Sequence, residues 1–275
     1  MTVRSAAPPA PWATAYPAFT RVFPDLRVRL DGRLEHGWVP VRRLLGSPAL
    51  RARLIAAELC AAERRYGRAP RPDVAAGFWL HRYAWPLCLL FTLPWLLQRR
   101  VPLLGPERLA CRHQPRGGPA ELAVLGSGST RFACLPDDPS TGHPGALVLP
   151  NQRALDAALR RTVAAQLGPL FAAFGPELRR GPRTLWGLAT DELVEGLWFA
   201  AGLLGEEARA VAALTGLLPA EPFAGAASFR ADGPDLRRSR VSCCLFYTLR
   251  PDRPCAGCPR NCRQPGANRQ LTGGD

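Results

Sequence analysis

The sequence contains no lysine. All 36 basic residues are arginine, and because they outnumber the 22 acidic residues the formal net charge is +14. A basic surface favours acidic partners and anionic ligands. The arginines are spread along the chain, however, and no helix-turn-helix, RNA-binding or zinc-finger pattern accompanies them. We therefore expect no nucleic-acid partner.

The chain also lacks a secretory signal and a long apolar run. Its first nineteen residues, MTVRSAAPPAPWATAYPAF, hold no apolar stretch followed by a small-residue cleavage site. One uncharged stretch, at residues 83–97, has fifteen residues and contains Pro86 and Pro94. A membrane-spanning helix needs about 20 residues, so this stretch predicts one buried core helix or two short ones. We expect no transmembrane span, which leaves peripheral membrane contact open.

Nine cysteines without an export signal argue against a disulfide framework. Four of them stand alone in apolar surroundings, and we expect these to pack as small hydrophobic residues: Cys60, Cys88, Cys111 and Cys134. The other five lie between residues 243 and 262. A metal or redox role is the better expectation for such a cluster.

Hydrophobic residues make up 47% of the 275 positions, enough for a sizeable core. Ser47 and Asn151 are suited to cap helices, and Gly168-Pro169 should kink or break the second of these. Further helices are expected at about 183–204 and 206–218, whereas residues 108–149 have the short alternating pattern of strands. These patterns predict an α+β fold, with a mainly helical body, a small antiparallel β-meander and a C-terminal cysteine-rich segment. We divide the chain into a Pro-rich N-terminal segment (1–45), the body (46–228) and the cysteine-rich segment (229–275).

The cysteine cluster has a distinctive spacing. Cys243 and Cys244 are adjacent, ten residues follow, and Cys255 and Cys258 form a C-x-x-C pair. Thiolates bind both zinc and iron–sulfur clusters, but zinc sites normally space paired cysteines by two to four residues. A two-iron cluster accepts more ligand geometries. The spacing therefore favours [2Fe–2S] over zinc, with these four cysteines as ligands. Cys262 completes a C-x2-C-x3-C run with Cys255 and Cys258, which also occurs in four-iron sites, so it could replace a ligand; we favour Cys262 as a spare, because the other four already complete the set.

The stretch SCCLFYTLRPDRPCAGC, residues 242–258, resembles the C-terminal signature of the FhuF-like ferric-siderophore reductases, in which CC-x10-C-x2-C holds a [2Fe–2S] cluster. Upstream, RTLWGLATDELVEGL is similar to a family helix, with Trp186 and Gly187 in place and Leu188 where asparagine is common. The stretch LGPLFAAF is also similar to a segment of the family. The resemblance covers roughly residues 50 to 262.

This resemblance implies a cytoplasmic oxidoreductase of iron homeostasis that reduces siderophore-bound Fe(III) to Fe(II) by one electron and so releases the iron. The body would bind the ferric siderophore, the cluster would be held by Cys243, Cys244, Cys255 and Cys258, and an electron donor such as a ferredoxin would supply electrons. The arginines near the cluster predict a preference for anionic ferric complexes.

Two other functions remain open: a [2Fe–2S] electron carrier, and a protein with a structural zinc site and an unknown partner. The large helical body argues against a simple carrier. The sequence does not identify the siderophore, and His81, His113 and His143 have no pattern that assigns them more than a structural place.

Overall fold

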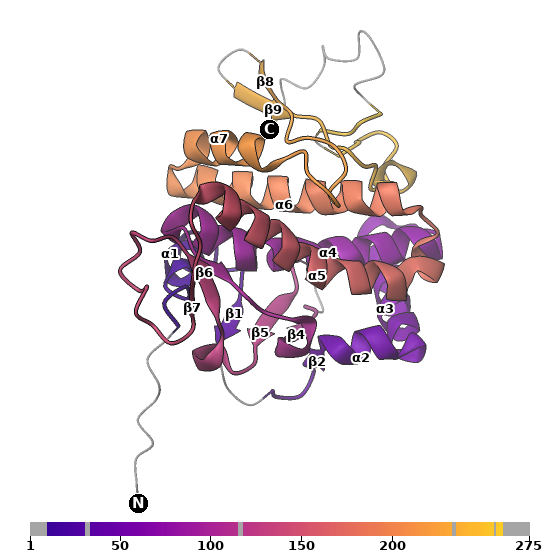
Figure 1. Cartoon of the computed structure of the whole chain (residues 1–275). Helices are drawn as coiled ribbons and strands as arrows, with labels where there is room; N and C mark the ends of the chain where they lie inside the picture. Colours follow the sequence, from indigo (N-terminus) through magenta and orange to yellow (C-terminus); the bar gives the residue numbers. More distant parts are fainter. Residues whose placement is uncertain (1–9, 31–33, 115–117, 233–234, 256, 261–275) are drawn as a thin grey trace, which may run out of the picture.

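The structure is a computed structural model, and it describes residues 10–30, 34–114, 118–232, 235–255 and 257–260. Cys262, the predicted spare cysteine, lies outside these ranges. The described chain has an α+β fold, which confirms the predicted fold class (Figure 1). Its helices are α1 (Ala15–Val22), α2 (Val41–Gly46), α3 (Pro48–Tyr66), α4 (Pro72–Gln98), α5 (Gln152–Leu178), α6 (Pro182–Leu204) and α7 (Glu207–Leu217), with short 3₁₀ turns η1 (Pro106–Arg108), η2 (Ser127–Ser129) and η3 (Phe246–Thr248).

Helix α4 is the centre of the fold. It packs against α1, α3, α5 and α6, and its Trp79, Tyr83, Leu87 and Phe91 have at most 1% of their surface exposed. The apolar run at 83–97 is thus a single buried core helix, one of the two predicted arrangements. Within the described parts of the chain, we find no helix with the length and apolarity needed to cross a bilayer.

Two prolines stand inside α4 without ending it. A proline has no N–H, so the carbonyl four residues earlier loses its helical partner. Ala120 N donates to the Arg82 carbonyl freed by Pro86, at 2.8 Å. The Tyr16 hydroxyl donates to the Leu90 carbonyl freed by Pro94, at 2.5 Å. The hydrogen bonds to these two freed carbonyls therefore connect α4 to the sheet region and to α1.

The predicted caps are confirmed. Ser47 Oγ accepts from the Leu50 N–H at 3.2 Å, and Asn151 Oδ1 accepts from the Ala154 N–H at 3.0 Å. Helix α5 begins at its cap and continues through Pro169 to Leu178, so of the expected kink or break the break does not occur. Leu167, Leu170 and Phe174 are fully buried on either side of the proline, and this packing outweighs the one lost hydrogen bond.

The strands form three small sheets. In chain order they are β1 (Val28–Leu30), β2 (Val39–Pro40), β3 (Val101–Pro102), β4 (Leu109–Arg112), β5 (Glu121–Val124), β6 (Phe132–Cys134), β7 (Ala146–Val148), β8 (Phe229–Asp232) and β9 (Asp235–Arg238). The first sheet has the order β1-β5-β4-β2 and the second β3-β6-β7, while β8 pairs with β9. The β1–β5 and β6–β7 pairs are parallel and the others antiparallel. Residues 108–149 therefore contribute to two sheets, because strands from earlier in the chain pair with them.

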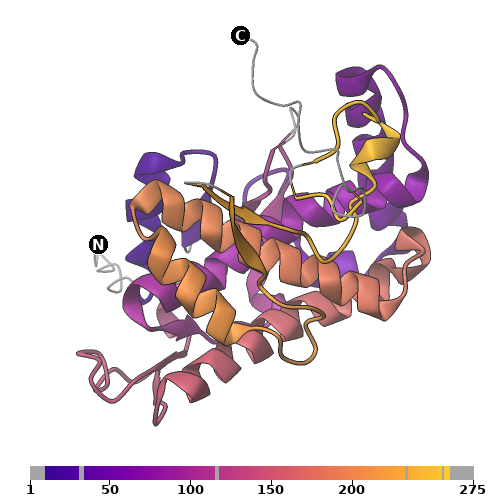
Figure 2. The same cartoon turned by 90° about the horizontal axis from the view of Figure 1, so that it is seen from above.

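The β1-β5-β4-β2 sheet and the cysteine-rich segment lie on opposite sides of the helices. Strands β1, β2, β4 and β5 lie below the helical layer in Figure 1, and the C-terminal segment crosses the outer face of α6 above it. Seen from above in Figure 2, the loop that carries the cysteines lies over the α3 end of the helical layer. The described part of the Pro-rich N-terminal segment joins the same core, since Trp12 and Phe19 are fully buried.

Replacing Tyr16 by phenylalanine should lower the free energy of unfolding by about 1–3 kcal/mol, because the buried Leu90 carbonyl loses its donor. In a Pro94→Ala background the restored N–H of residue 94 can donate to that carbonyl, so Tyr16→Phe should lower the free energy of unfolding by less. Urea unfolding of the four proteins in this double-mutant cycle measures the difference. Equal costs in both backgrounds would contradict the explanation.

Candidate metal centre

The approach to the cysteines is fixed by one buried carboxylate on α6. Asp191, with no exposed surface, accepts from the Val241 N–H, from the Ser242 N–H and from the Ser242 hydroxyl, each at 2.8 Å. The guanidinium of Arg238 donates to the same carboxylate at 2.6 Å. Charge-assisted hydrogen bonds of this kind are the strong ones. They hold the backbone directly before Cys243 against the helix.

Two further carboxylates of α6 extend this contact. Arg240 lies 3.1 Å from Glu192 and 3.4 Å from Glu195, and Arg238 lies 3.4 Å from Glu195. Only 1% of the Arg238 side chain and 8% of the Arg240 side chain are exposed. Because a lone buried charge is strongly unfavourable, these opposite charges stabilise the segment only as a set.

The chain folds back on itself around the cysteines. The Arg240 N–H donates to the Gly257 carbonyl at 2.8 Å, which brings the two ends of the cysteine segment together. Gly257 has φ +67°, and a Cβ at this position would clash with the Arg238 carbonyl oxygen. Only glycine fits there. Arg180 also holds the segment, because it donates to the Cys243 carbonyl at 2.6 Å.

The four predicted ligands lie in this one folded segment. The sulfurs of Cys244 and Cys255 are 3.5 Å apart, although eleven positions separate them in the sequence. Two thiolates bound tetrahedrally to one metal ion, with bonds of 2.3 Å, are about 3.8 Å apart. This pair therefore fits a shared metal ion, whether iron or zinc. Cys258 is 2% exposed and Cys243 is partly buried.

The complete ligand set is not assembled at coordination distance. Among the described residues, no three His, Cys, Asp or Glu side chains converge closely enough to hold a metal ion. The pair Cys244 and Cys255 thus fits a shared metal ion by distance, whereas Cys243 and Cys258 only share the same folded loop. The identity of the metal stays a prediction.

The two paired sulfurs differ in acidity. A hydrogen bond from Cys255 lowers the pKa of Cys244 to about 6, against the opposing effect of burial, and the Phe246 N–H and the charge of Arg240 lower it further. The same hydrogen bond raises the pKa of Cys255, which retains its proton. Since the thiolate is the form that binds a metal, Cys244 is prepared to bind one at neutral pH.

The isolated cysteines take no part in this site. Cys88, Cys111 and Cys134 are buried in the main core, as expected of small hydrophobic residues. Burial raises the pKa of Cys111 to about 12, so its thiol stays protonated. Cys60, on α3, is exposed and does not follow the expectation.

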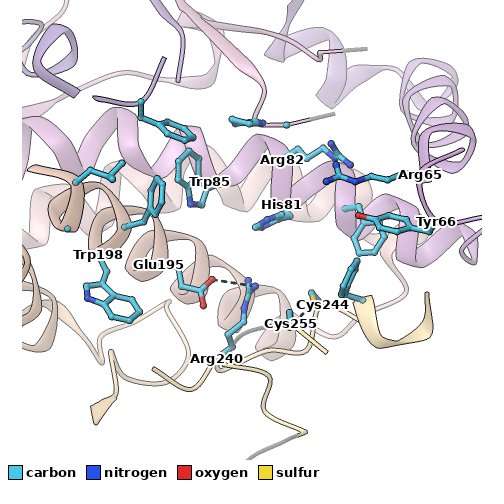
Figure 3. A pocket seen from close by; sticks show the side chains of 18 of the residues that line it. Arg65, Tyr66, His81, Arg82, Trp85, Glu195, Trp198, Arg240, Cys244 and Cys255 are labelled. Carbon is cyan, nitrogen blue, oxygen red and sulfur yellow. Dashed lines mark hydrogen bonds and ion pairs between the residues drawn. The ribbon is translucent and has the colours of Figure 1, made fainter. Parts of the chain in front are cut away.

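A cavity of about 940 Å³ opens beside the paired cysteines (Figure 3). Its wall is built by α3, α4 and α6 on one side and by the cysteine segment on the other, with Cys244 and Cys255 both in the wall. Ligand cavities commonly span about 300–1,000 Å³. The cavity is therefore large enough for a small organic complex in contact with the two sulfurs.

His81, to which the sequence assigned no role, lies in this cavity between the cysteines and Trp85 (Figure 3). Its Nδ1 is 2.7 Å from Glu192. Burial lowers the pKa of His81, but the Glu192 carboxylate raises it by more, so the net direction is upward. The histidine is thus joined to the carboxylate network that holds the cysteine segment.

Sequence reasoning also missed Asp191, Glu192 and Glu195. Their signal was present in TDELVEGLW, where three acidic residues interrupt an otherwise apolar helix. Acidic residues are almost never fully buried unless they are paired. Nothing local identified their partners, because Arg238 and Arg240 lie more than 40 residues later.

Replacing Asp191 by asparagine should lower the free energy of unfolding by about 3–5 kcal/mol, because Arg238 and Arg240 are left underpaired in the interior. The cysteine segment should then open to chymotrypsin after Phe246 or Tyr247. Time-resolved proteolysis followed by mass spectrometry measures the opening. Glu206→Gln is the matched control, since the exposed pair with Arg209 is worth at most about 1 kcal/mol. Equal protection in both variants would contradict the anchoring role.

In metal-free protein at pH 7, iodoacetamide should alkylate Cys244 before Cys255, because Cys244 is mostly thiolate. The rate should fall as the pH drops through about 6, where Cys244 takes up a proton. Exposed Cys60 provides an internal reference for access of the reagent. Peptide mass spectrometry gives each rate, and a Cys255 that reacts first would overturn the assignment.

Comparison with models of known protein families finds no match to this chain, and comparison with curated proteins finds none either. The resemblance of residues 242–258 to the siderophore-reductase signature therefore rests on the residues themselves.

Proposed function

We propose that this protein is a ferric-siderophore reductase, which transfers one electron to Fe(III) held in a small organic chelate and so releases Fe(II). The observation that carries this proposal is the cavity of about 940 Å³ whose wall includes Cys244 and Cys255. A chelate bound there would touch the residues that hold the redox centre.

A [2Fe–2S] cluster bound by Cys243, Cys244, Cys255 and Cys258 would supply one electron at a time. The protein's own residues have three tasks. The α6 carboxylates hold the cysteine segment in place, the cavity wall positions the chelate, and the close packing of the segment on α6 limits the access of water. Siderophores bind Fe(III) through hard oxygen ligands and Fe(II) far more weakly, so no bond of the chelator has to break.

The cavity favours a reductase over an electron carrier. A carrier exposes its redox centre to a partner protein and has no need of a ligand-sized chamber beside its cysteines. Here α3, α4, α6 and the cysteine segment, together with Phe23, residues 118–119 and Glu207, all contribute to the chamber. A structural zinc site would likewise leave the chamber without a purpose.

An acidic ferredoxin is the proposed electron donor, because the chain carries a net charge of +14 and complementary charge speeds encounter. Arg253 and Arg260 of the cysteine segment are exposed and available for such contact. We place the reaction in the cytoplasm, where an imported ferric siderophore and a reduced ferredoxin would both be present.

Chemically reduced protein, mixed without oxygen with a ferric siderophore and ferrozine, should give the coloured Fe(II)–ferrozine complex. About one Fe(II) should form per protein, since a two-iron centre delivers one electron. The initial rate should saturate with siderophore concentration, because the chelate must first occupy the cavity. The return of the visible absorption of the oxidised cluster, followed by stopped-flow, provides the rate. Rapid reoxidation by a partner protein with none by any ferric siderophore would favour the carrier.

Serine variants provide the controls. Changing Cys243, Cys244, Cys255 or Cys258 should remove or shift the visible absorption and abolish iron release, whereas Cys262→Ser should leave both nearly intact. A colourless purified protein that contains zinc would overturn the proposal.

A further inference from the structure

The cavity beside the cysteines has an aromatic group at each end. At one end, Phe23 lies 5.8 Å from Trp85 and 5.2 Å from Phe199, measured between ring centres. At the other end, next to Cys244, Phe246 lies 5.5 Å from Tyr66 and 6.3 Å from Phe78. All six rings line the cavity. Rings at these spacings leave faces and edges on which a further planar ring can stack.

The charged residues between the two ends are already paired. Arg82 lies 2.9 Å from Glu58, and Arg240 lies between Glu192 and Glu195. His81 also contacts Glu192. These arginines therefore offer little free positive charge to a ligand, and this removes the basis for expecting a preference for anionic complexes.

Two lining charges lack an opposite partner within the described parts of the chain, and they have opposite signs. Arg65 is exposed at the end of α3, where it lies 5.7 Å from the ring of Tyr66. Glu207 is exposed at the start of α7 and accepts a hydrogen bond from Trp198. In Figure 3, Arg65 and Trp198 lie on opposite sides of the cavity. The wall as a whole is thus close to neutral.

A multiply charged anion would lose its hydration in this cavity without gaining matching positive charge. A chelate with little net charge avoids this cost, and planar rings on that chelate would gain contact with the two aromatic groups.

We propose that the cavity selects ferric chelates of low net charge whose ligands carry aromatic rings, such as uncharged complexes of aryl-phenolate ligands. That the bound complex contains Fe(III) rests on the proposed function, whereas the preference for aromatic rings and low net charge follows from the residues of the cavity wall.

Gallium(III) chelates test the preference without electron transfer, because gallium has the charge and nearly the size of Fe(III) but is not reduced under these conditions. Calorimetric titration of the whole, metal-loaded protein would compare three probes: an uncharged aryl-phenolate gallium complex, an uncharged tris(alkylhydroxamate) complex and a trianionic tris(catecholate) complex. The first should bind about tenfold or more tightly than either of the others, since each stacked ring contributes about three- to tenfold.

Two variants separate stacking from general apolar contact. Phe199→Leu removes a ring at a position that is 43% exposed, so the fold should tolerate it. Phe246→Leu does the same beside Cys244. Each should weaken the aryl complex about three- to tenfold and change the alkyl complex less than about twofold. Tyr247→Leu is the matched control, because its ring contacts Arg260 and does not line the cavity.

The outcomes distinguish the two proposals. Equal affinity for aryl and alkyl complexes, or tightest binding of the trianion, would overturn the ligand preference even if every ferric complex is reduced. The expected order of affinities together with no reduction of the matching ferric complexes would overturn the reductase function and leave the ligand preference in place.

Discussion

The contact between the Asp191 carboxylate and residues 238–242 is the interaction on which the rest of the site depends. One buried acidic side chain accepts two backbone N–H groups, a hydroxyl and a guanidinium. Without this carboxylate, the cysteine-rich segment would have little apolar surface to hold it on α6, because it consists of short elements and two paired strands. With it, the backbone before Cys243 has one position, and the turn closed by Arg240 and Gly257 brings the second pair of cysteines back to the first.

The same docking creates the cavity. Helices α3, α4 and α6 present aromatic side chains on one face, and the cysteine segment covers part of that face without filling it. The cysteines and most of the other cavity-lining residues thus come from different parts of the chain and meet only when the segment is in place. A change that loosens the Asp191 anchor would therefore disturb the cysteine segment and the cavity together, although Asp191 does not line the cavity.

The arginine-rich composition suggested a positively charged site, but the buried arginines next to the cysteines are paired with carboxylates. Arg238 and Arg240 stand five and three residues before Cys243, and both are paired with α6 carboxylates. Their role is structural and electrostatic within the protein. Exposed arginines of the segment, such as Arg253 and Arg260, lie outside the cavity wall.

The sequence alone determined the features that depend on neighbours along the chain: the caps at Ser47 and Asn151, the buried character of residues 83–97, and the spacing of the four cysteines. It could not show that α5 continues through Pro169, because packing of the core outweighs the local cost. It could not show the partners of Asp191 or the cavity, because both join residues far apart in the chain. Only the tertiary structure decided these, since a buried charge and a cavity wall are defined by what lies across from them.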